Sequence, residues 1–569
     1  MSAQAPIMSR EKIIESVNVE FHTASNPRLI PILDLPEGLV NPETSHTYDF
    51  KLFPEDQPFT FGILQIKIAD TPMLNQHQVL DSSNDISGSM SDTCSDGKSK
   101  MQHAIHTLKN IITSLAKSEQ SSVTMATYGF DDNVETIFPD TKITQDNAAE
   151  LRSKLEGLQP RNGTDLNQAL EMQSKRSSER YIANPHVHQT NITMTDGQAN
   201  QGKTTIYSEM SKQVAPNCTN IFIGFGRDHN AGGLQQLADA QPNGSYFYVA
   251  EIEKAGLVFC EVIHQMLYTA LTNITIELTN AEIYDYKTNT WQSKLQIPSI
   301  VSEATKTYHI RSNTPHWVTA EISAQSAIHD EPEPSIISDD NTCPPALLNC
   351  DTNEPLVTDL SLYMLRQRTQ ELMFKSHQYS LLDYKNATIE NRNTIRTEMM
   401  QYLGFMRQYA KEQNLEDDDM LKTLITDISV ILQTFGGPKA AMYSAARTGS
   451  QGRQTSNNVS YVAPEDMIAC GKYHRTPRAR GLQRQNAING FQYQDQDQDQ
   501  DQDDLDILGS LPSLPPPLLP QLSRTNTTPR QMSLMREMSQ GCHILELDQE
   551  ELVLPPAAIT DDEETSSPN

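Results

Sequence analysis

The feature that most constrains the fold is an alternation of strand-like and helix-like patterns between residues 77 and 268. The strand candidates are TMATYGF, NITMTDG, TNIFIGFG and GSYFYVA, and the helix candidates are 98–117, 144–157, 165–178, 205–214, 231–240 and 254–268. Such alternation is typical of a parallel sheet covered by helices on both faces. The pattern therefore predicts an α/β domain of the doubly wound, Rossmann-like type.

Strand patterns also flank this α/β region on both sides. VNVEF, HTYDFKLF and TFGILQIKI in 17–70, and further runs in 269–323, alternate apolar with polar residues, as strands with one buried face do. Each flank alone would leave unpaired strand edges, so we expect 17–70 to pair with the later strands in a β-sandwich. Residues 1–16 are assigned as an N-terminal tail.

A helical region is predicted at 356–450, after a linker rich in Asp, Pro and Ser at 324–355. One apolar stripe at helical spacing runs from Ile395 to Tyr409, and a second runs from Met420 to Phe435, where Gly-Gly-Pro ends the helix. We expect the two stripes to face each other in a small bundle.

The segment 451–569 is predicted to be a mostly disordered, low-complexity tail. Its Gln-Asp repeat (494–504) offers no apolar atom to bury. LPSLPPPLLPQL (511–522) is typical of polyproline II, a ligand for grooves of the SH3 or WW type. A solvated spacer is the alternative for both.

Composition limits the classes of function. The net charge of −29 argues against nucleic-acid binding and favours solubility and cation binding. We find no signal peptide and no apolar run of about 18 residues, so no membrane role is expected. The seven cysteines are scattered and form no CxxC pair, which favours free thiols inside the cell. We expect an intracellular, cytoplasmic location, with a place in a viral particle left open.

The motif DISGSM at 85–90 has the composition of a metal-binding loop. Asp85, Ser87 and Ser89 stand at alternate positions, and Gly88 allows the tight turn that brings their oxygens together. If a strand ends near Asp85, this loop lies at the carboxyl edge of the sheet, where open α/β folds bind ligands. A Ser-rich turn that caps a helix is the alternative for this motif alone.

Two distant segments favour the metal-binding interpretation. Thr164 in GTDLNQAL precedes a helix pattern, and Asp196 in ITMTDGQANQG follows a strand pattern. In a parallel sheet both loops reach the same edge as DISGSM, so hydroxyl and carboxylate oxygens from three loops meet there. Such hard oxygen ligands suit Mg²⁺.

Together these motifs resemble those of a known protein family. Residues 77–268 look like a von Willebrand factor A (vWA) domain with a metal-ion-dependent adhesion site. The resemblance implies Ser87, Ser89 and Thr164 as direct ligands of Mg²⁺ or Mn²⁺, with Asp85 and Asp196 binding directly or through water. The flanks resemble multi-domain vWA proteins of eukaryotes and large DNA viruses, which carry a sandwich-like segment and then a helical region.

We expect a non-enzymatic binding protein. Two carboxylates and three hydroxyls roughly balance a dication, and the remaining coordination position suits a Glu or Asp of a protein partner. The motifs offer no His or Cys as general base or nucleophile, so hydrolase activity is a minor alternative. A second alternative is a structural or assembly scaffold, viral for example, whose vWA fold does not use metal.

The first strand departs from the family pattern, because Asp81, Ser82, Ser83 and Asn84 stand where a central strand should be apolar. A buried Asp81 without a partner would cost several kcal/mol. Either Asp81 is paired, or the strand is distorted or shorter. A frame that begins at Asp81 would lack the Gly-Ser-Met that follows Ser87, so the Asp85 frame is preferred.

Overall fold

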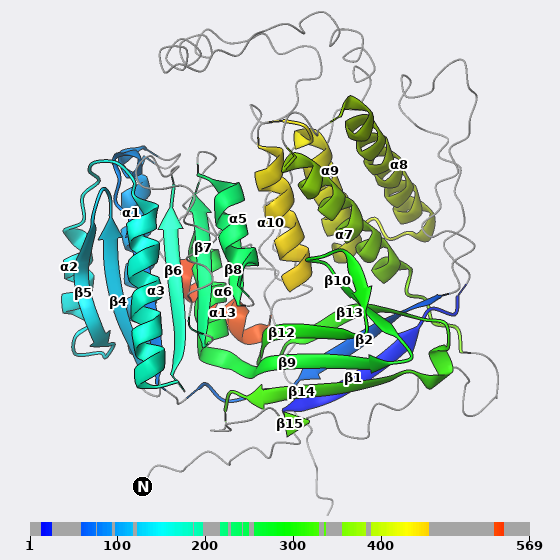
Figure 1. Ribbon diagram of the computed structural model, residues 1–569, viewed down its shortest axis with the longest axis horizontal. Coiled ribbons are helices and arrows are strands. Elements are labelled where there is room, and N and C mark those ends of the chain that lie inside the picture. The colour runs from blue at the N-terminus through cyan, green and yellow to red at the C-terminus, as the bar shows by residue number, and fades with distance from the viewer. Residues whose placement is uncertain are drawn as a thin grey trace, which may run out of the picture.

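The computed structural model describes residues 13–24, 59–74, 77–93, 97–117, 122–185, 187–196, 215, 217–225, 229–241, 243–249, 255–328, 335–336, 356–382, 388–437, 439–454 and 528–539. Within these ranges an α/β domain, a β-sandwich and a group of helices pack against one another (Figure 1). The mixed α/β class predicted from the sequence is confirmed. The predicted strand HTYDFKLF and the predicted helix 205–214 lie outside the described residues.

The α/β domain is built on one six-stranded sheet in the order β5-β4-β3-β6-β7-β8. Its strands are β3 (Gln78–Asp85), β4 (Val123–Phe130), β5 (Val134–Lys142), β6 (His188–Thr195), β7 (Cys218–Phe225) and β8 (Gly244–Val249). All neighbours are parallel except β5, which runs antiparallel to β4 at the edge and was not predicted. The strand β3 therefore lies inside the sheet, with β4 on one side and β6 on the other.

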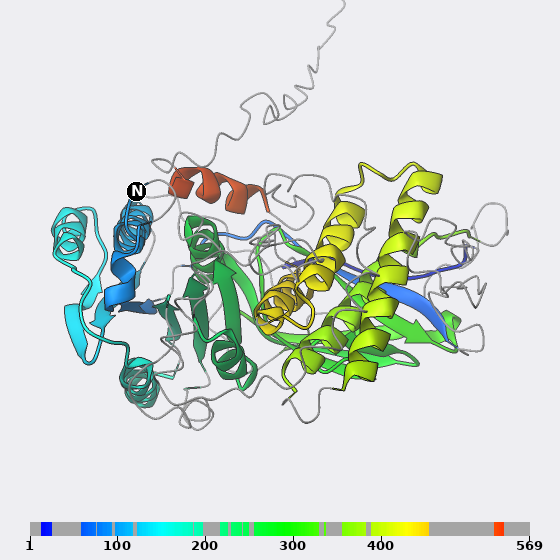
Figure 2. The same cartoon turned by 90° about the horizontal axis from the view of Figure 1, so that it is seen from above.

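Helices cover both faces of this sheet, as Figure 2 shows from above. They are α1 (Lys100–Lys117), α2 (Ala148–Glu156), α3 (Leu166–Ala183), α5 (Ala231–Asp239) and α6 (Ala255–Tyr268). One apolar core joins α1, α2 and α6 to the sheet through residues such as Leu108, Ile192 and Phe259. On the other face, α3 and α5 pack on residues such as Phe130 and Phe222. Alternate residues of each strand thus supply the two cores.

The sandwich combines strands from both flanks of the α/β domain. One sheet has the order β1-β2-β13-β10-β11 and the other β12-β9-β14-β15. The strands are β1 (Ile14–Phe21), β2 (Thr60–Ile68), β9 (Thr269–Thr279), β10 (Glu282–Asp285), β11 (Thr290–Gln292), β12 (Lys294–Val301), β13 (Thr305–Ser312), β14 (Thr319–Ser326) and β15 (Ser335–Ile336). Two expectations need correction, since β1 begins inside the predicted N-terminal tail and β15 lies inside the predicted linker.

Four helices form the third unit: α7 (Ser361–Ser380), α8 (Ile389–Gln413), α9 (Asp419–Thr434) and α10 (Ala440–Arg453). Both predicted apolar stripes contribute to a single core, through Met399 and Met406 of α8 and Leu424 and Ile431 of α9. Phe61 of β2 also lies in that core, which joins the helices to the sandwich. The helix α10 was not predicted as a separate element, and it extends past residue 450.

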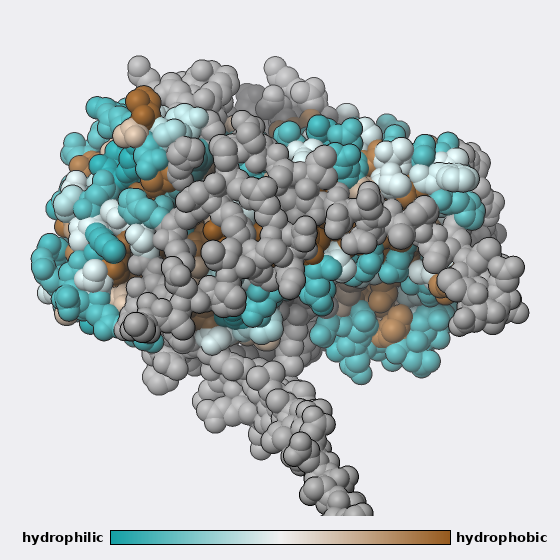
Figure 3. Space-filling model, turned by 90° about the horizontal axis from the view of Figure 1, so that it is seen from below, coloured by the Kyte–Doolittle hydropathy of each residue, from teal (hydrophilic) through white to brown (hydrophobic). Residues whose placement is uncertain are grey.

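A last helix, α13 (Pro529–Ser539), lies inside the segment predicted to be mostly disordered. It packs on α6 and α1 of the α/β domain (Figures 1 and 2). No helix in the described ranges has both the length and the apolarity needed to cross a bilayer. On the face seen from below, the described side chains are mainly hydrophilic, with hydrophobic ones scattered among them (Figure 3).

Candidate metal centre

Asp85 is the last residue of β3 and is fully buried at the carboxyl edge of the sheet. Its Oδ1 accepts a 2.8 Å hydrogen bond from the Ser87 backbone N–H, and its Oδ2 accepts a 2.6 Å bond from the Thr195 hydroxyl. Burial raises the pKa of Asp85 to about 6, although the hydrogen bonds from Ser87 and Thr195 lower it. A nearby dication would favour the ionised carboxylate and reverse this shift.

The two serines of the motif form a line of oxygens that ends at Asp196. Ser87 Oγ lies 3.1 Å from Ser89 Oγ, and Ser89 Oγ donates a 2.7 Å hydrogen bond to Asp196 Oδ1. In an octahedral Mg²⁺ site with ligands at about 2.1 Å, adjacent oxygens lie about 3.0 Å apart. These oxygens are therefore spaced as adjacent ligands of one cation would be.

The loop that carries Thr164 packs directly on the DISGSM loop. The Arg161 N–H donates to the carbonyl of Ile86 at 2.8 Å, and the Gly88 N–H donates to the carbonyl of Asn162 at 3.1 Å. Thr164 follows this contact and is buried, with 3% of its surface exposed. The structure thus brings the loop bearing Thr164, as predicted, to the same sheet edge as Asp85.

Two carboxylates that the sequence analysis missed hold this second loop in place. Asp131 Oδ2 accepts 2.8 Å bonds from Arg161 Nε and Asn162 Nδ2, and Asp132 Oδ1 accepts a 3.1 Å bond from the Gly163 N–H. The pair Asp131-Asp132 directly follows the strand β4, which places it at the carboxyl edge. That position was the signal that could have identified both residues as positioning groups.

Lys100 is a further residue of the site that the sequence analysis missed. Its ammonium nitrogen lies 2.6 Å from Asp196 Oδ2 and 3.1 Å from the exposed Asp92 Oδ2. Burial by itself would lower the pKa of Lys100, but its contacts with Asp196 raise the pKa above the usual value. A positive charge from the protein itself therefore neutralises Asp196.

Replacing Lys100 with methionine is expected to tighten Mg²⁺ binding about tenfold. A cation at Asp196 has to compete with the ammonium group, and a hydrogen bond to a charged partner is worth about 1.5–3 kcal/mol. Calorimetric titration of the variant and the wild type measures the difference. Lys109→Met is the matched control, because Lys109 lies on the same helix and pairs with Glu156 instead. Equal Mg²⁺ affinities in wild type and Lys100→Met would contradict competition at Asp196.

Asp81 of the polar first strand is accommodated by an ion-pair cluster under α3. Asp81 is fully buried, and its oxygens accept 2.7 and 2.9 Å bonds from Arg180 and a 3.4 Å bond from Arg176. Both arginines also pair with Asp140 of β5. Asp81 therefore has partners, and β3 keeps its regular register with β4 and β6 through Asn84. Of the two possible starts of the metal motif, Asp81 and Asp85, only Asp85 has its carboxylate at the carboxyl edge of the sheet.

The donor set fits a hard dication. Asp85, Ser87, Ser89, Thr164 and Asp196 offer oxygen alone, which is the preference of Mg²⁺ and Mn²⁺. Among the residues that the structure describes, no three His, Cys, Asp or Glu side chains gather into a metal-binding group. The site thus depends on hydroxyls as much as on carboxylates.

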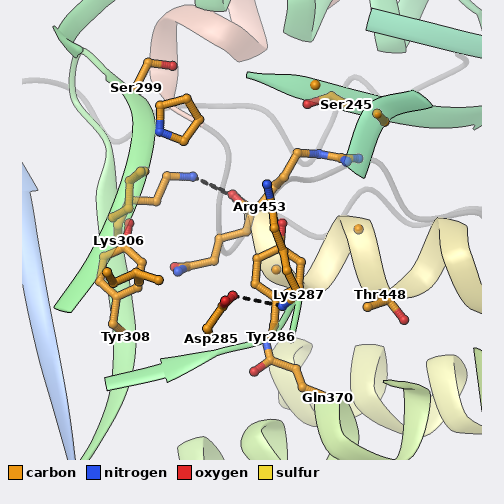
Figure 4. Close-up of a pocket in the computed structure, with 18 of the residues that line it drawn as sticks. Ser245, Asp285, Tyr286, Lys287, Ser299, Lys306, Tyr308, Gln370, Thr448 and Arg453 are labelled. Atoms are coloured by element: carbon orange, nitrogen blue, oxygen red, sulfur yellow. Dashed lines mark hydrogen bonds between the residues drawn. The ribbon is translucent and has the colours of Figure 1, made fainter. Parts of the chain in front are cut away.

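A separate cavity of about 720 Å³ lies where the α/β domain, the sandwich and the helices meet. Figure 4 shows Lys306 pointing at the backbone oxygen of Arg453, the last residue of α10, at 2.7 Å. Arg366 likewise donates to the backbone oxygen of Gln451 at 2.8 Å. Burial lowers the pKa of Lys306 to about 8. These two cations therefore stabilise the carbonyl end of α10, where the helix dipole places a negative partial charge.

Comparison with known proteins gives a matching family model and several similar solved structures. Residues 85–247 match the family model of the von Willebrand factor type A domain. A search of curated proteins gives no match. Among solved structures, a von Willebrand factor type A protein from Catenulispora acidiphila is similar at 13% identity, over 69% of this chain and 92% of that chain, with a TM-score of 0.46.

Two further solved structures are similar. The ArnB paralogue VWA2 from Sulfolobus acidocaldarius matches at 14% identity, over 69% of this chain and 94% of that chain, with a TM-score of 0.40. Proximal thread matrix protein 1 from the mussel byssus, with a zinc-occupied MIDAS motif, matches at 20% identity, over 37% of this chain and 51% of that chain, with a TM-score of 0.29. The family model therefore places a von Willebrand factor type A domain at residues 85–247, within the α/β domain.

Proposed function

We propose that the vWA domain is a non-enzymatic protein-binding module that captures an acidic side chain of a partner through a bound Mg²⁺ or Mn²⁺. The observation that carries the proposal is the line of oxygens from Ser87 through Ser89 to Asp196, with separations of 3.1 and 2.7 Å. Asp85 and Thr164 complete the proposed ligand set.

The proposed ligand set leaves a coordination position of the cation open to a carboxylate. Two carboxylates and three neutral hydroxyls leave a dication close to neutral, and protein side chains do not fill all six of its positions. The cation would supply an electrophilic position for a Glu or Asp of the partner. The role of the chain is to hold its five oxygens at the sheet edge, and the carboxylates Asp131 and Asp132 hold the loop between Arg161 and Thr164.

No catalytic step is proposed at this site. Catalysis beside a metal needs a general base or nucleophile, and the motifs DISGSM, GTDLNQAL and TDGQAN contain neither His nor Cys. With a net charge of −29, the chain is not proposed to bind nucleic acid or an anionic membrane. The proline-rich segment 511–522 is proposed as a second contact, for a partner of the SH3 or WW type.

Capture of acidic peptides tests the proposal. The immobilised chain is exposed to a peptide array in which every Glu or Asp peptide has a Gln or Asn twin. We expect retention of acidic members in Mg²⁺, and its loss in EDTA and in Asp196→Ala. Asp92→Ala should retain capture, since Asp92 also contacts Lys100 but is largely exposed. Capture that persists in EDTA would count against the proposal.

The second candidate is a structural or assembly scaffold that uses no metal. It is favoured by Lys100, whose ammonium group lies 2.6 Å from the buried Asp196 and supplies a positive charge from the chain itself. Calorimetric titration with Mg²⁺ and Mn²⁺ separates the two candidates. Heat that saturates at one equivalent supports capture through a cation, and the absence of heat supports the scaffold.

A further inference from the structure

The helix α13 contacts the vWA domain far from the proposed metal centre. It lies along α6 and also touches α1 (Figures 1 and 2). Its first turn contacts Asp70 and Thr71, which precede β3, whereas the metal-binding loop follows β3. The docked segment therefore lies near the opposite end of the sheet from the metal centre.

Arg530 makes most of the polar contacts of this helix. Its guanidinium pairs with Asp70 Oδ1 at 2.5 Å, donates to the carbonyl of Thr71 at 2.6 Å, and lies over the Tyr268 ring at 5.0 Å from the centroid. An arginine that combines an ion pair, a backbone contact and an aromatic face is typical of a specific recognition contact. The Arg530 side chain therefore contributes three of the contacts that position the helix on the domain.

Thr528 provides a second polar contact at the start of the helix. Its hydroxyl oxygen accepts a 3.2 Å bond from the Gln531 N–H and lies 3.2 Å from His264 Nε2 of α6. Burial, and then the charge of Arg530, lower the pKa of His264 to about 4, so the ring is neutral and can accept the hydroxyl proton. Thr528 and Gln531 are both buried at this contact.

Within the described side chains, 528–534, the apolar part of the contact is small by comparison. Leu534 is only partly buried where it packs on the core that α1 and α6 form with the sheet. That core contains Leu108, Ile112, Phe259 and Ile263, and among the described side chains of α13 (528–534) only Leu534 packs against it. Over 528–534 the helix thus contributes mainly polar contacts to the surface of the domain, as a bound peptide can.

We propose that the surface formed by α6, α1 and Asp70-Thr71 is a peptide-binding site, called here the α13 groove, and that residues 528–539 are its ligand, held in cis and detachable. Residues 455–527 separate this segment from the end of α10. At about 3.4 Å per residue, such a length of chain reaches at most roughly 250 Å, so attachment imposes no strain on docking. Tethering makes the docking intramolecular and raises its effective concentration.

A free peptide of residues 524–541, carrying a fluorophore, tests the proposal against the full-length chain. The wild-type chain is compared with the full-length double variant Arg530→Glu and Leu534→Glu, which leaves the groove intact but weakens its own ligand. Fluorescence anisotropy should show the peptide binding to the double variant at least about tenfold more tightly than to wild type, because the tethered segment competes.

Charge reversal supplies the matched control. A peptide carrying Arg530→Glu should bind neither chain, and adding Asp70→Arg to the double variant should abolish its binding of the wild-type peptide. Asp70 is largely exposed, so this change can be made without burying a charge. A folded double variant that fails to bind the wild-type peptide would overturn the proposal. So would a wild-type dimer that the double variant converts to a monomer, since docking would then occur between chains.

Hydrogen exchange on the wild-type chain covers the case in which the double variant does not fold. A detachable ligand opens without unfolding the domain, so the amides of α13 should exchange with a lower opening free energy than those of α6. Equal opening free energies for the two helices would show that α13 is an integral part of the domain and would overturn the proposal.

Discussion

Replacing Asp81 with alanine is expected to destabilise the vWA domain by about 3–5 kcal/mol, because breaking a buried ion pair leaves an uncompensated charge. Asp81 is fully buried under α3, where Arg180 approaches within 2.7 Å. Without Asp81, the carboxylate that still pairs with Arg176 and Arg180 is the half-exposed Asp140. Denaturant unfolding, read from the midpoint at constant slope, measures the loss.

Two comparisons separate this effect from ordinary loss of a surface charge. Asp140→Ala removes the exposed member of the same cluster and should cost about 1 kcal/mol or less. The double variant Asp81→Val with Arg180→Met should be more stable than Asp81→Ala, because it leaves fewer unpaired charges beneath the sheet. Similar losses for Asp81→Ala and Asp140→Ala would contradict the assignment of Asp81 as the buried centre of the cluster.

The second large effect is expected from the metal itself. At a Mg²⁺ concentration one hundred times the Kd, the wild-type domain should gain about 2.7 kcal/mol of stability, since the cation binds the folded form alone. Ser87→Ala and Asp196→Ala should gain nothing, because each removes an oxygen from the line that joins Ser87, Ser89 and Asp196. Thermal unfolding with and without Mg²⁺ measures both results.

The control for this experiment is Asp92→Ala. Asp92 contributes an exposed carboxylate beside Lys100 and is not a proposed ligand. Its Mg²⁺-dependent gain should therefore match that of the wild type. A gain that survives in Asp196→Ala would place the cation elsewhere, and a wild type that gains nothing would favour the metal-free scaffold.

Local sequence patterns were sufficient to predict much of this architecture. The alternation of apolar strands with amphipathic helices indicated the doubly wound sheet, and the stripes through Met399 and Leu424 indicated helices that share a core. Asp85 was placed at the sheet edge on the assumption that a strand ends there, although the residues from Asp81 to Asn84 lack the apolar pattern of a central strand. Each of these inferences needs only the spacing of apolar residues along the chain and the rule that parallel strands end at the same edge of a sheet.

Features that depend on distant partners could not be predicted. Arg180 stands ninety-nine positions from Asp81, and nothing local to either residue indicates their pairing. Lys100 belongs to a polar loop and helix start, so its contact with Asp196 has no periodic signal. The contacts of Thr528 with His264 and of Arg530 with Asp70 join segments at least 264 positions apart, so nothing local to residues 528–534 indicates where the helix docks.

The pairing of β2 with β13 has a consequence for synthesis. Ile66 lies opposite Lys306 in that ladder, and the whole vWA domain is encoded between the two strands. A ribosome adding 5–20 residues per second needs roughly 10–50 s to make the intervening chain. During that interval the strand β2 pairs with β1 on one edge, but its other edge is unpaired because β13 has not yet been made. The vWA domain can therefore finish folding first. In that interval β1 and β2 are the strands that a nascent-chain chaperone would bind.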